Sequence, residues 1–405
     1  MIGAEQSIDA LLDSFAGVVI GVGVNVQPEQ ELIIAAPLEA AAFVRSLGSA
    51  AYMRGASLVT PVYDDPELLR TRLLHETAEA LDSSDDWLAN SIAQRLHQGA
   101  AYLSVLGPRP ELLAGVPVER ILHAHRAQAR GDAVLNAVIA SLQTNASSVP
   151  FITGAWARQI FPNSEPGKAR RFFWSELIDA VTGSDIITAE QTAWDRLGAL
   201  SKRRVLLQAH AFRALHFTGP KIRLSIGLAD GHIWRGGREL SRRGVAFAPV
   251  LPAGAVFTAT APETTEGVIA FSRPIAIAGE HVEGLEVRFE AGAATRVIAR
   301  SGQSAFERLL DSDAGARRLG KIAIVEATAP LANRHGSFKN PMLDGAAAPH
   351  VTFGATLPGT LTDPKTGNES AIHLDAMFDT AHLSVDGIDA HGTAHAILRD
   401  GIFAL

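Results

Sequence analysis

Glu31-Leu32-Ile33-Ile34-Ala35-Ala36 is a short apolar run that ends at a proline, and it decides the fold class of the chain. The segment that follows, residues 38–53, has apolar residues at three- and four-residue spacing, which predicts a helix. A second apolar run at residues 56–63 is typical of another strand. Strand, helix and strand in this order form a βαβ unit, which requires a parallel sheet with a right-handed crossover.

The rest of the first half extends this pattern. Apolar runs at residues 101–106 and 150–155 are expected to add strands to the same sheet. Residues 112–142 and 172–212 have helical periodicity, and Pro117 interrupts the first of these stretches near its start. Together these elements predict an N-terminal α/β sandwich domain built on a parallel sheet.

The second half of the sequence is typical of short strands. Its runs alternate apolar and polar residues, are rich in β-branched side chains, and are separated by glycine, proline and acidic residues. One helix is expected to interrupt these strands over residues 303–318. The predicted strands lie at residues 223–227, 244–251, 267–272 and 285–289.

We expect two domains, because 405 residues exceed the usual size of a single core. The change from helical to strand periodicity lies near residues 205–222, where Gly219-Pro220 punctuates the chain. We place an N-terminal α/β domain at residues 1–210 and a C-terminal β-rich catalytic domain at residues 211–405.

The composition excludes several classes of function. The chain has no cysteine, which excludes disulfides, thiolate metal sites and a cysteine nucleophile. It has 36 basic and 43 acidic residues, and no basic run could neutralise a nucleic-acid backbone. Residues 1–15 lack the basic region of a secretion signal, and the longest apolar stretch, residues 15–26, is too short to cross a bilayer. We expect a cytoplasmic protein without nucleic-acid or membrane partners.

Ile372-His373-Leu374-Asp375 is the pattern that points to chemistry. On an extended strand, residues i and i+2 project from the same face, so this imidazole and this carboxylate lie side by side. His350 begins another strand-like run and is the best candidate for a third ligand. These three residues predict a metal site. The alternative is that His373 is a buried, hydrogen-bonded side chain and Asp375 a surface residue.

Several motifs match those of a known family in order and spacing, almost from end to end. They are Asn25-Val26-Gln27-Pro28, residues 150–162, residues 225–228 with 231–234, Val256-Phe257-Thr258, residues 315–320 and Ile372-His373-Leu374-Asp375. In these motifs the chain resembles the thermophilic-type metallo-aminopeptidases, the aminopeptidase T and S family. The resemblance implies a C-terminal β-rich metal-binding domain of the aminopeptidase T type.

The resemblance also implies a two-metal site, from which this sequence departs. Family members hold two metal ions with two glutamates, two histidines, a tyrosine and an aspartate. Motif by motif, the glutamates correspond to Ala255 and Lys321, and the tyrosine corresponds to Leu357. Two adjacent dications need bridging carboxylates, and the Lys321 ammonium would repel a second ion, so hydrolysis by two metal ions is not expected. The ligands that remain are His350, His373 and Asp375.

Two histidines and one carboxylate also form the facial triad of mononuclear non-haem Fe(II) oxygenases. The 2,5-dihydroxypyridine dioxygenases resemble the same architecture and use a His, His and Asp set. The first hypothesis is therefore an Fe(II)-dependent, extradiol-type dioxygenase that cleaves a dihydroxypyridine- or catechol-like ring with O₂, in aromatic degradation. Two alternatives are a single-zinc, aminopeptidase-like hydrolase, for which Glu326 is the nearest glutamate that could act as base, and a metal-free relic that binds a ligand or partner.

Further candidate site residues are expected around the ligands. His232, Lys321 and His335 are candidate catalytic residues, because a base must take the hydroxyl proton of the substrate. The resembling families also imply a homodimer or a larger homo-oligomer. Candidates for the walls of the substrate pocket are Trp234, Phe257, Phe353 and Leu357.

Overall fold

The computed structural model divides into two compact units, each formed by two segments of the chain. The first unit contains residues 1–197 and 238–253, and the second contains residues 198–237 and 254–405. The residues that the structure describes are 7–84, 86–109, 112–183, 185, 187–277, 280–332 and 334–405.

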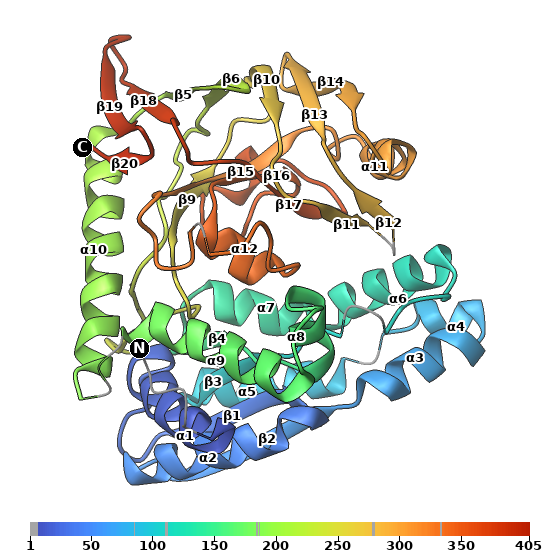
Figure 1. The fold of residues 1–405 in the computed structure, drawn as a ribbon, viewed down its shortest axis with the longest axis vertical. Coiled ribbons are helices and arrows are strands. Elements are labelled where there is room, and N and C mark those ends of the chain that lie inside the picture. The colour runs from blue at the N-terminus through green and yellow to red at the C-terminus, as the bar shows by residue number, and fades with distance from the viewer. Residues whose placement is uncertain are drawn as a thin grey trace. The chain divides into compact units, whose positions relative to one another are not determined.

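A four-stranded parallel sheet with the order β2-β1-β3-β4 organises the first unit (Figure 1). Helix α2 (Ala41–Met53) connects the first two strands, which confirms the βαβ unit. Its inner face packs because Phe43, Val44 and Leu47 recur at helical spacing and are all buried. The strands are β1 (Glu31–Pro37), β2 (Leu58–Asp64), β3 (Ala101–Leu106) and β4 (Ala146–Pro150).

The sequence predictions for the end of this unit need two corrections. The last strand ends at Pro150 instead of beginning there, because the Thr153 hydroxyl accepts a hydrogen bond from the Trp156 N–H and starts a helix. The helical stretch at residues 172–212 is two helices, because Gly183 adopts a positive φ of 72° and ends the first of them. The other α-helices of the first unit are α1 (Ile8–Val18), α3 (Pro66–His75), α4 (Ala78–Asp82), α5 (Trp87–Gln98), α6 (Val118–Gly131), α7 (Ala133–Ala140), α8 (Gly154–Ile160) and α9 (Pro166–Thr182), and α10 (Ala189–His210) continues from the first unit into the second at Gly198.

An aromatic cluster forms part of the core of the first unit. Phe15 of α1, Phe43 of α2, Phe151 after β4 and Trp174 of α9 are at most 1% exposed. The Trp174 ring lies 5.7 Å from that of Phe43 and 5.8 Å from that of Phe151. These contacts hold three helices against the end of the sheet through buried apolar area.

The second unit contains an eight-stranded antiparallel sheet and a four-stranded antiparallel sheet. Their orders are β14-β13-β10-β6-β5-β18-β19-β20 and β17-β16-β15-β9. The strands of the larger sheet are β5 (Ala214–Gly219), β6 (Ile222–Gly227), β10 (Glu266–Ala270), β13 (Glu286–Glu290), β14 (Ala293–Ile298), β18 (Ser384–Ile388), β19 (Ala394–Arg399) and β20 (Ile402–Phe403). Those of the smaller sheet are β9 (Ala255–Ala259), β15 (Leu319–Val325), β16 (His350–Gly354) and β17 (His373–Met377).

Two further expectations for the later sequence are wrong in length. The predicted strand at residues 244–251 is reduced to β8 (Ala246–Phe247), which pairs with β7 (Glu239–Leu240), and both belong to the first unit. The helix expected at residues 303–318 is α11 (Gln303–Leu310). It stops early because Asp313 is held in a loop, where its carboxylate accepts hydrogen bonds from the Gly315 and Ala371 N–H groups. The remaining elements of the second unit are β11 (Ile275–Ile277), β12 (Glu280–Val282), α12 (Pro341–Ala347) and a 3₁₀ helix (Pro364–Thr366).

Phe353 of β16 lies at the centre of an aromatic cluster that joins the elements of the second unit. Its ring lies 5.7 Å from that of Phe289 on β13 and 5.3 Å from that of Phe306 on α11. All three side chains are at most 1% exposed. Phe353 therefore belongs to the core between the two sheets.

In the part of the chain that the structure describes, no helix is long and apolar enough to cross a membrane.

We expect Phe353→Ala to lower the free energy of unfolding by about 3–5 kcal/mol, because it would leave a cavity in this core. Urea unfolding monitored by circular dichroism measures the effect. The matched control is Phe172→Ala, which removes a ring that is 54% exposed and is expected to cost less than about 1 kcal/mol. Equal effects of the two substitutions would contradict the core position of Phe353.

Candidate active site

One face of the four-stranded sheet brings the predicted ligands together. The register of β15, β16 and β17 places Lys321 opposite Thr352, and Thr352 opposite Asp375. Directly opposed residues of antiparallel strands project from the same face, so these three side chains form a row. His350 and His373 lie two residues from Thr352 and Asp375, and strand alternation puts them on the same face. We call Lys321, His350, Thr352, His373 and Asp375 the Asp375 cluster.

Asp375 is the centre of this cluster. Lys321 Nζ lies 3.0 Å from Asp375 Oδ1 and 3.2 Å from Oδ2. The Thr352 hydroxyl donates a further hydrogen bond to Oδ1. The side chains of Lys321 and Asp375 are only 8% and 16% exposed. The cluster therefore contains a largely desolvated ion pair, and the loss of either partner would leave a buried charge without compensation.

Both imidazoles turn the same nitrogen toward the carboxylate. The Nε2 atoms of His350 and His373 each lie 3.9 Å from an oxygen of Asp375. Their Nδ1 atoms lie 3.1 Å from the backbone carbonyl oxygens of Ala348 and Ala355. A carbonyl can only accept, so each neutral ring carries its proton on Nδ1 and presents a lone pair on Nε2. Histidines that bind metals are held in this way by backbone carbonyls.

The electrostatics of the cluster keep the imidazoles neutral and the carboxylate charged. Burial lowers the pKa of His350 to about 4, and the Lys321 ammonium contributes in the same direction. Burial also lowers the pKa of His373. Burial opposes ionisation of Asp375, but the adjacent Lys321 ammonium and the Thr352 hydroxyl favour the charged form, and the pKa of this carboxyl lies well below the ordinary value. At neutral pH the cluster is thus an anion, a cation and two neutral nitrogen donors.

The chemistry of these donors fits one metal ion. Two neutral imidazoles and a carboxylate are ligands that zinc accepts. The arrangement is not closed around an ion: tetrahedral ligands about 2.1 Å from zinc lie about 3.4 Å apart, less than the 3.9 Å found here. Within the described ranges, no group of three or more His, Asp or Glu side chains is arranged to hold an ion as it stands. A second ion is not supported, because Ala255 and Leu357 carry no side-chain donor.

Phe257 and Lys321 are the other predicted site residues that the structure brings together. Phe257 lies on β9, opposite Ala323, and its ring centroid is 5.7 Å from Lys321 Nζ. This distance allows a cation–π interaction that holds the ammonium near the carboxylate.

The structure gives three further predicted site residues contacts of their own in the second unit. His232 Nδ1 lies 2.9 Å from the Ala229 carbonyl oxygen, and burial lowers the pKa of this imidazole. The His335 ring lies against that of Phe338, 5.1 Å away, in the segment before α12. The carbonyl of Leu357 accepts a hydrogen bond from the Thr360 hydroxyl.

Three other side chains that the sequence suggested for the site are buried. Trp234 is 1% exposed, and Phe353 projects from the face of β16 opposite to His350, into the aromatic core. The alternative base, Glu326, pairs with Arg203 and accepts a hydrogen bond from the Phe403 N–H. Glu326 therefore fastens the C-terminal strand.

Sequence reasoning missed the residues that support the cluster. Thr352 could have been found from its position two residues after His350. Gly345 of α12 packs against the same imidazole, because a Cβ atom there would lie only 3.2 Å from His350 Cε1. Asp344 forms a buried ion pair with Arg273 and accepts a hydrogen bond from the Phe338 N–H. This network holds α12, which contacts β9, β15 and β17 (Figure 1).

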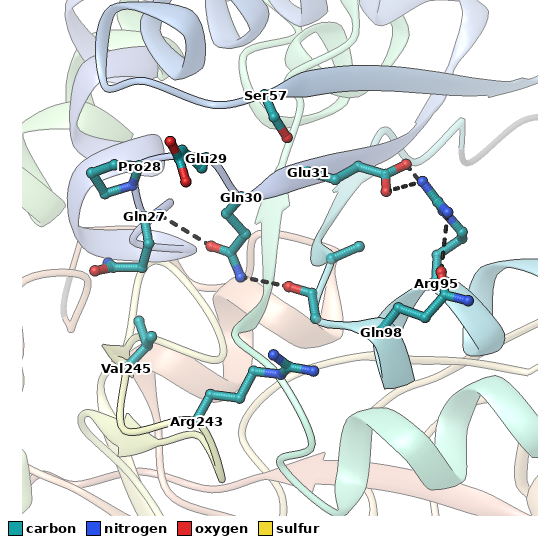
Figure 2. Close-up of a pocket in the computed structure, with 12 residues that line it drawn as sticks. Gln27, Pro28, Glu29, Gln30, Glu31, Ser57, Arg95, Gln98, Arg243 and Val245 are labelled. Carbon is teal, nitrogen blue, oxygen red and sulfur yellow. Dashed lines mark hydrogen bonds and ion pairs between the residues drawn. The ribbon is translucent and has the colours of Figure 1, made fainter.

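A depression with a volume of about 480 Å³ lies in the first unit (Figure 2). It is found at the amino ends of β1 and β3, whereas ligands of open α/β sheets bind at the carboxyl ends. Many of its polar groups have partners. Arg95 forms an ion pair with Glu31. The side-chain oxygen of Gln30 accepts a hydrogen bond from the Gln27 N–H, and its side-chain nitrogen donates one to Asn145 Oδ1. The Asp375 cluster remains the better candidate for chemistry.

Comparisons with known proteins agree with this fold. The sequence matches the thermophilic metalloprotease family, M29, over residues 8–403. It is 39% identical to aminopeptidase T of Thermus thermophilus over 96% of this chain and 97% of that protein. It is 31% identical to aminopeptidase 2 of Geobacillus stearothermophilus over 97% of each chain. The solved structure of wild-type AmpT from Thermus thermophilus superposes with a TM-score of 0.91 at 38% identity, covering 98% of this chain and 100% of that one.

These matches overturn the dioxygenase hypothesis. The named relatives are aminopeptidases, so an Fe(II) extradiol enzyme of aromatic degradation, with an aromatic substrate and O₂ as partners, is the wrong expectation. The error has a physical reason: two histidines and a carboxylate bind iron and zinc alike, so the ligand set does not identify the reaction. A metalloprotease family does imply a metal cofactor.

The sequence motifs, the parallel sheet of the first unit and the β-rich second unit all agree with these relatives. The agreement extends over nearly the whole length of the chain. The chain belongs to the thermophilic metalloprotease family, M29.

Proposed function

We propose that this protein is an aminopeptidase-like hydrolase of peptides that uses a single metal ion, zinc, held by His350, His373 and Asp375. The observation that carries the proposal is the orientation of the two neutral imidazoles, whose Nε2 lone pairs face one carboxylate. The relatives support the reaction class, because those named above are aminopeptidases and match this chain nearly from end to end.

Zinc bound there would supply a Lewis acid and lower the pKa of a bound water. The protein's own groups prepare the donors. The carbonyls of Ala348 and Ala355 hold the protons of the imidazoles on Nδ1, and the Thr352 hydroxyl orients the Asp375 carboxylate. The positive charge of Lys321 lies beside this carboxylate, where a peptide carbonyl oxygen would find a cationic partner.

The first experiment measures bound metals by elemental analysis and hydrolysis of aminoacyl anilides and short peptides by the zinc-loaded protein. We expect about one zinc per chain and release of the N-terminal residue. A zinc-loaded protein that cleaves none of these substrates would overturn the proposed function.

We expect His350→Ala, His373→Ala and Asp375→Asn each to weaken zinc binding by more than about 100-fold, because each removes one of only three donors. Isothermal titration calorimetry measures the affinity, and circular dichroism checks the fold. The matched control is His216→Ala, which changes an exposed histidine on β5 and should leave zinc affinity unchanged. Unchanged affinity in all three variants would exclude this ligand set.

We expect Lys321→Glu alone to leave the zinc stoichiometry at about one per chain, because Ala255 and Leu357 still provide no donors for a second ion. The triple variant Ala255→Glu/Lys321→Glu/Leu357→Tyr is expected to bind about two. Elemental analysis after dialysis gives both numbers. Two zinc ions in the single variant would show that other residues supply the second site.

A further inference from the structure

We infer that Lys321 is an internal competitor for the metal ion: its ammonium occupies Asp375, and zinc binds by displacing it. The inference rests on the proposed function, because it concerns the same three donors. It adds a property of this chain, namely that a lysine side chain sets the affinity of the site for the ion.

The ammonium lies where the carboxylate would otherwise meet a metal ion. Lys321 Nζ is within 3.2 Å of both oxygens of Asp375, and the Thr352 hydroxyl uses a further lone pair of Oδ1. His350 and His373 present lone pairs to Asp375, not protons, so neither imidazole compensates its charge. The ammonium is therefore the charge partner of this carboxylate. An incoming dication would replace an ion pair that already exists.

The position of Lys321 also limits how far the ammonium can move away. Its strand is paired on both sides, with Ala259 of β9 and Thr352 of β16 opposite it. The side chain is 8% exposed and lies 5.7 Å from the Phe257 ring. Only rotation of the side chain can release Asp375, because the backbone is fixed by both ladders. The displaced ammonium stays close enough to repel the ion that replaced it.

Lys321→Met tests this inference, because methionine has a similar length and no charge. We expect the variant to bind zinc at least about tenfold more tightly than the wild type in calorimetric titration. Without zinc the variant should melt at a lower temperature, since Asp375 loses its partner, and zinc should restore the melting temperature by more than it raises that of the wild type. The matched control is Lys202→Met, which removes the same charge at an exposed position on α10 and should change neither quantity.

A second variant keeps the test decisive if Lys321→Met folds poorly without metal. Lys321→Gln removes the charge but keeps an N–H donor for Asp375, so it is expected to fold without zinc and to bind zinc more tightly than the wild type; an affinity within about twofold of the wild type would overturn the inference. Zinc affinity of folded Lys321→Met within about twofold of the wild type would overturn the inference, as would failure of the folded variant to bind zinc at all. The wild type could bind zinc without cleaving peptides while Lys321→Met binds zinc more tightly. That combination of results would overturn the proposed function and support the inference.

Discussion

The ion pair between Lys321 and Asp375 is the constraint on which the rest of the site depends. A largely buried carboxylate needs a cation, and in this protein the chain supplies that cation itself. The Thr352 hydroxyl fixes the carboxylate, and two backbone carbonyls turn the imidazoles so that their lone pairs face it. The result is a cluster of a carboxylate and two neutral nitrogen donors, in which the ammonium lies beside the carboxylate that we propose as a metal ligand.

The antiparallel sheet makes this arrangement precise enough for chemistry. Alternation along β16 places His350 and Thr352 on the site face and sends Phe353 into the aromatic core on the other. The core anchors the strand, and the strand positions the donors. On the site face, the Arg273–Asp344 pair holds α12, whose Gly345 leaves room for the His350 imidazole. Stability and function thus use opposite faces of the same strands.

The fold agrees with that of the relatives, although the sequence departs from the ligand set that the resemblance implies. The chain superposes closely on wild-type AmpT from Thermus thermophilus, yet a lysine, an alanine and a leucine replace the donors that the resemblance implies for a second ion. Each replacement lies on a framework of paired strands or turns, so the fold does not depend on the metal ligands. The side chain at position 321 can therefore differ in charge while the paired strands around it remain.

Local periodicity in the sequence was sufficient for the βαβ unit, for the β-rich second half, and for the shared face of His373 and Asp375, because all three follow from short-range alternation. It missed helix ends that depend on single residues, such as the positive φ of Gly183 and the cap at Thr153. Only the tertiary structure joined Lys321 to Asp375, since strand register between residues 54 positions apart is a non-local property. Only the tertiary structure likewise showed that Phe353, which the sequence suggested as a pocket wall, lies in the aromatic core. The ligand set does not identify a reaction class, because the same three ligand types serve iron and zinc, so the proposed reaction rests on the family relationship.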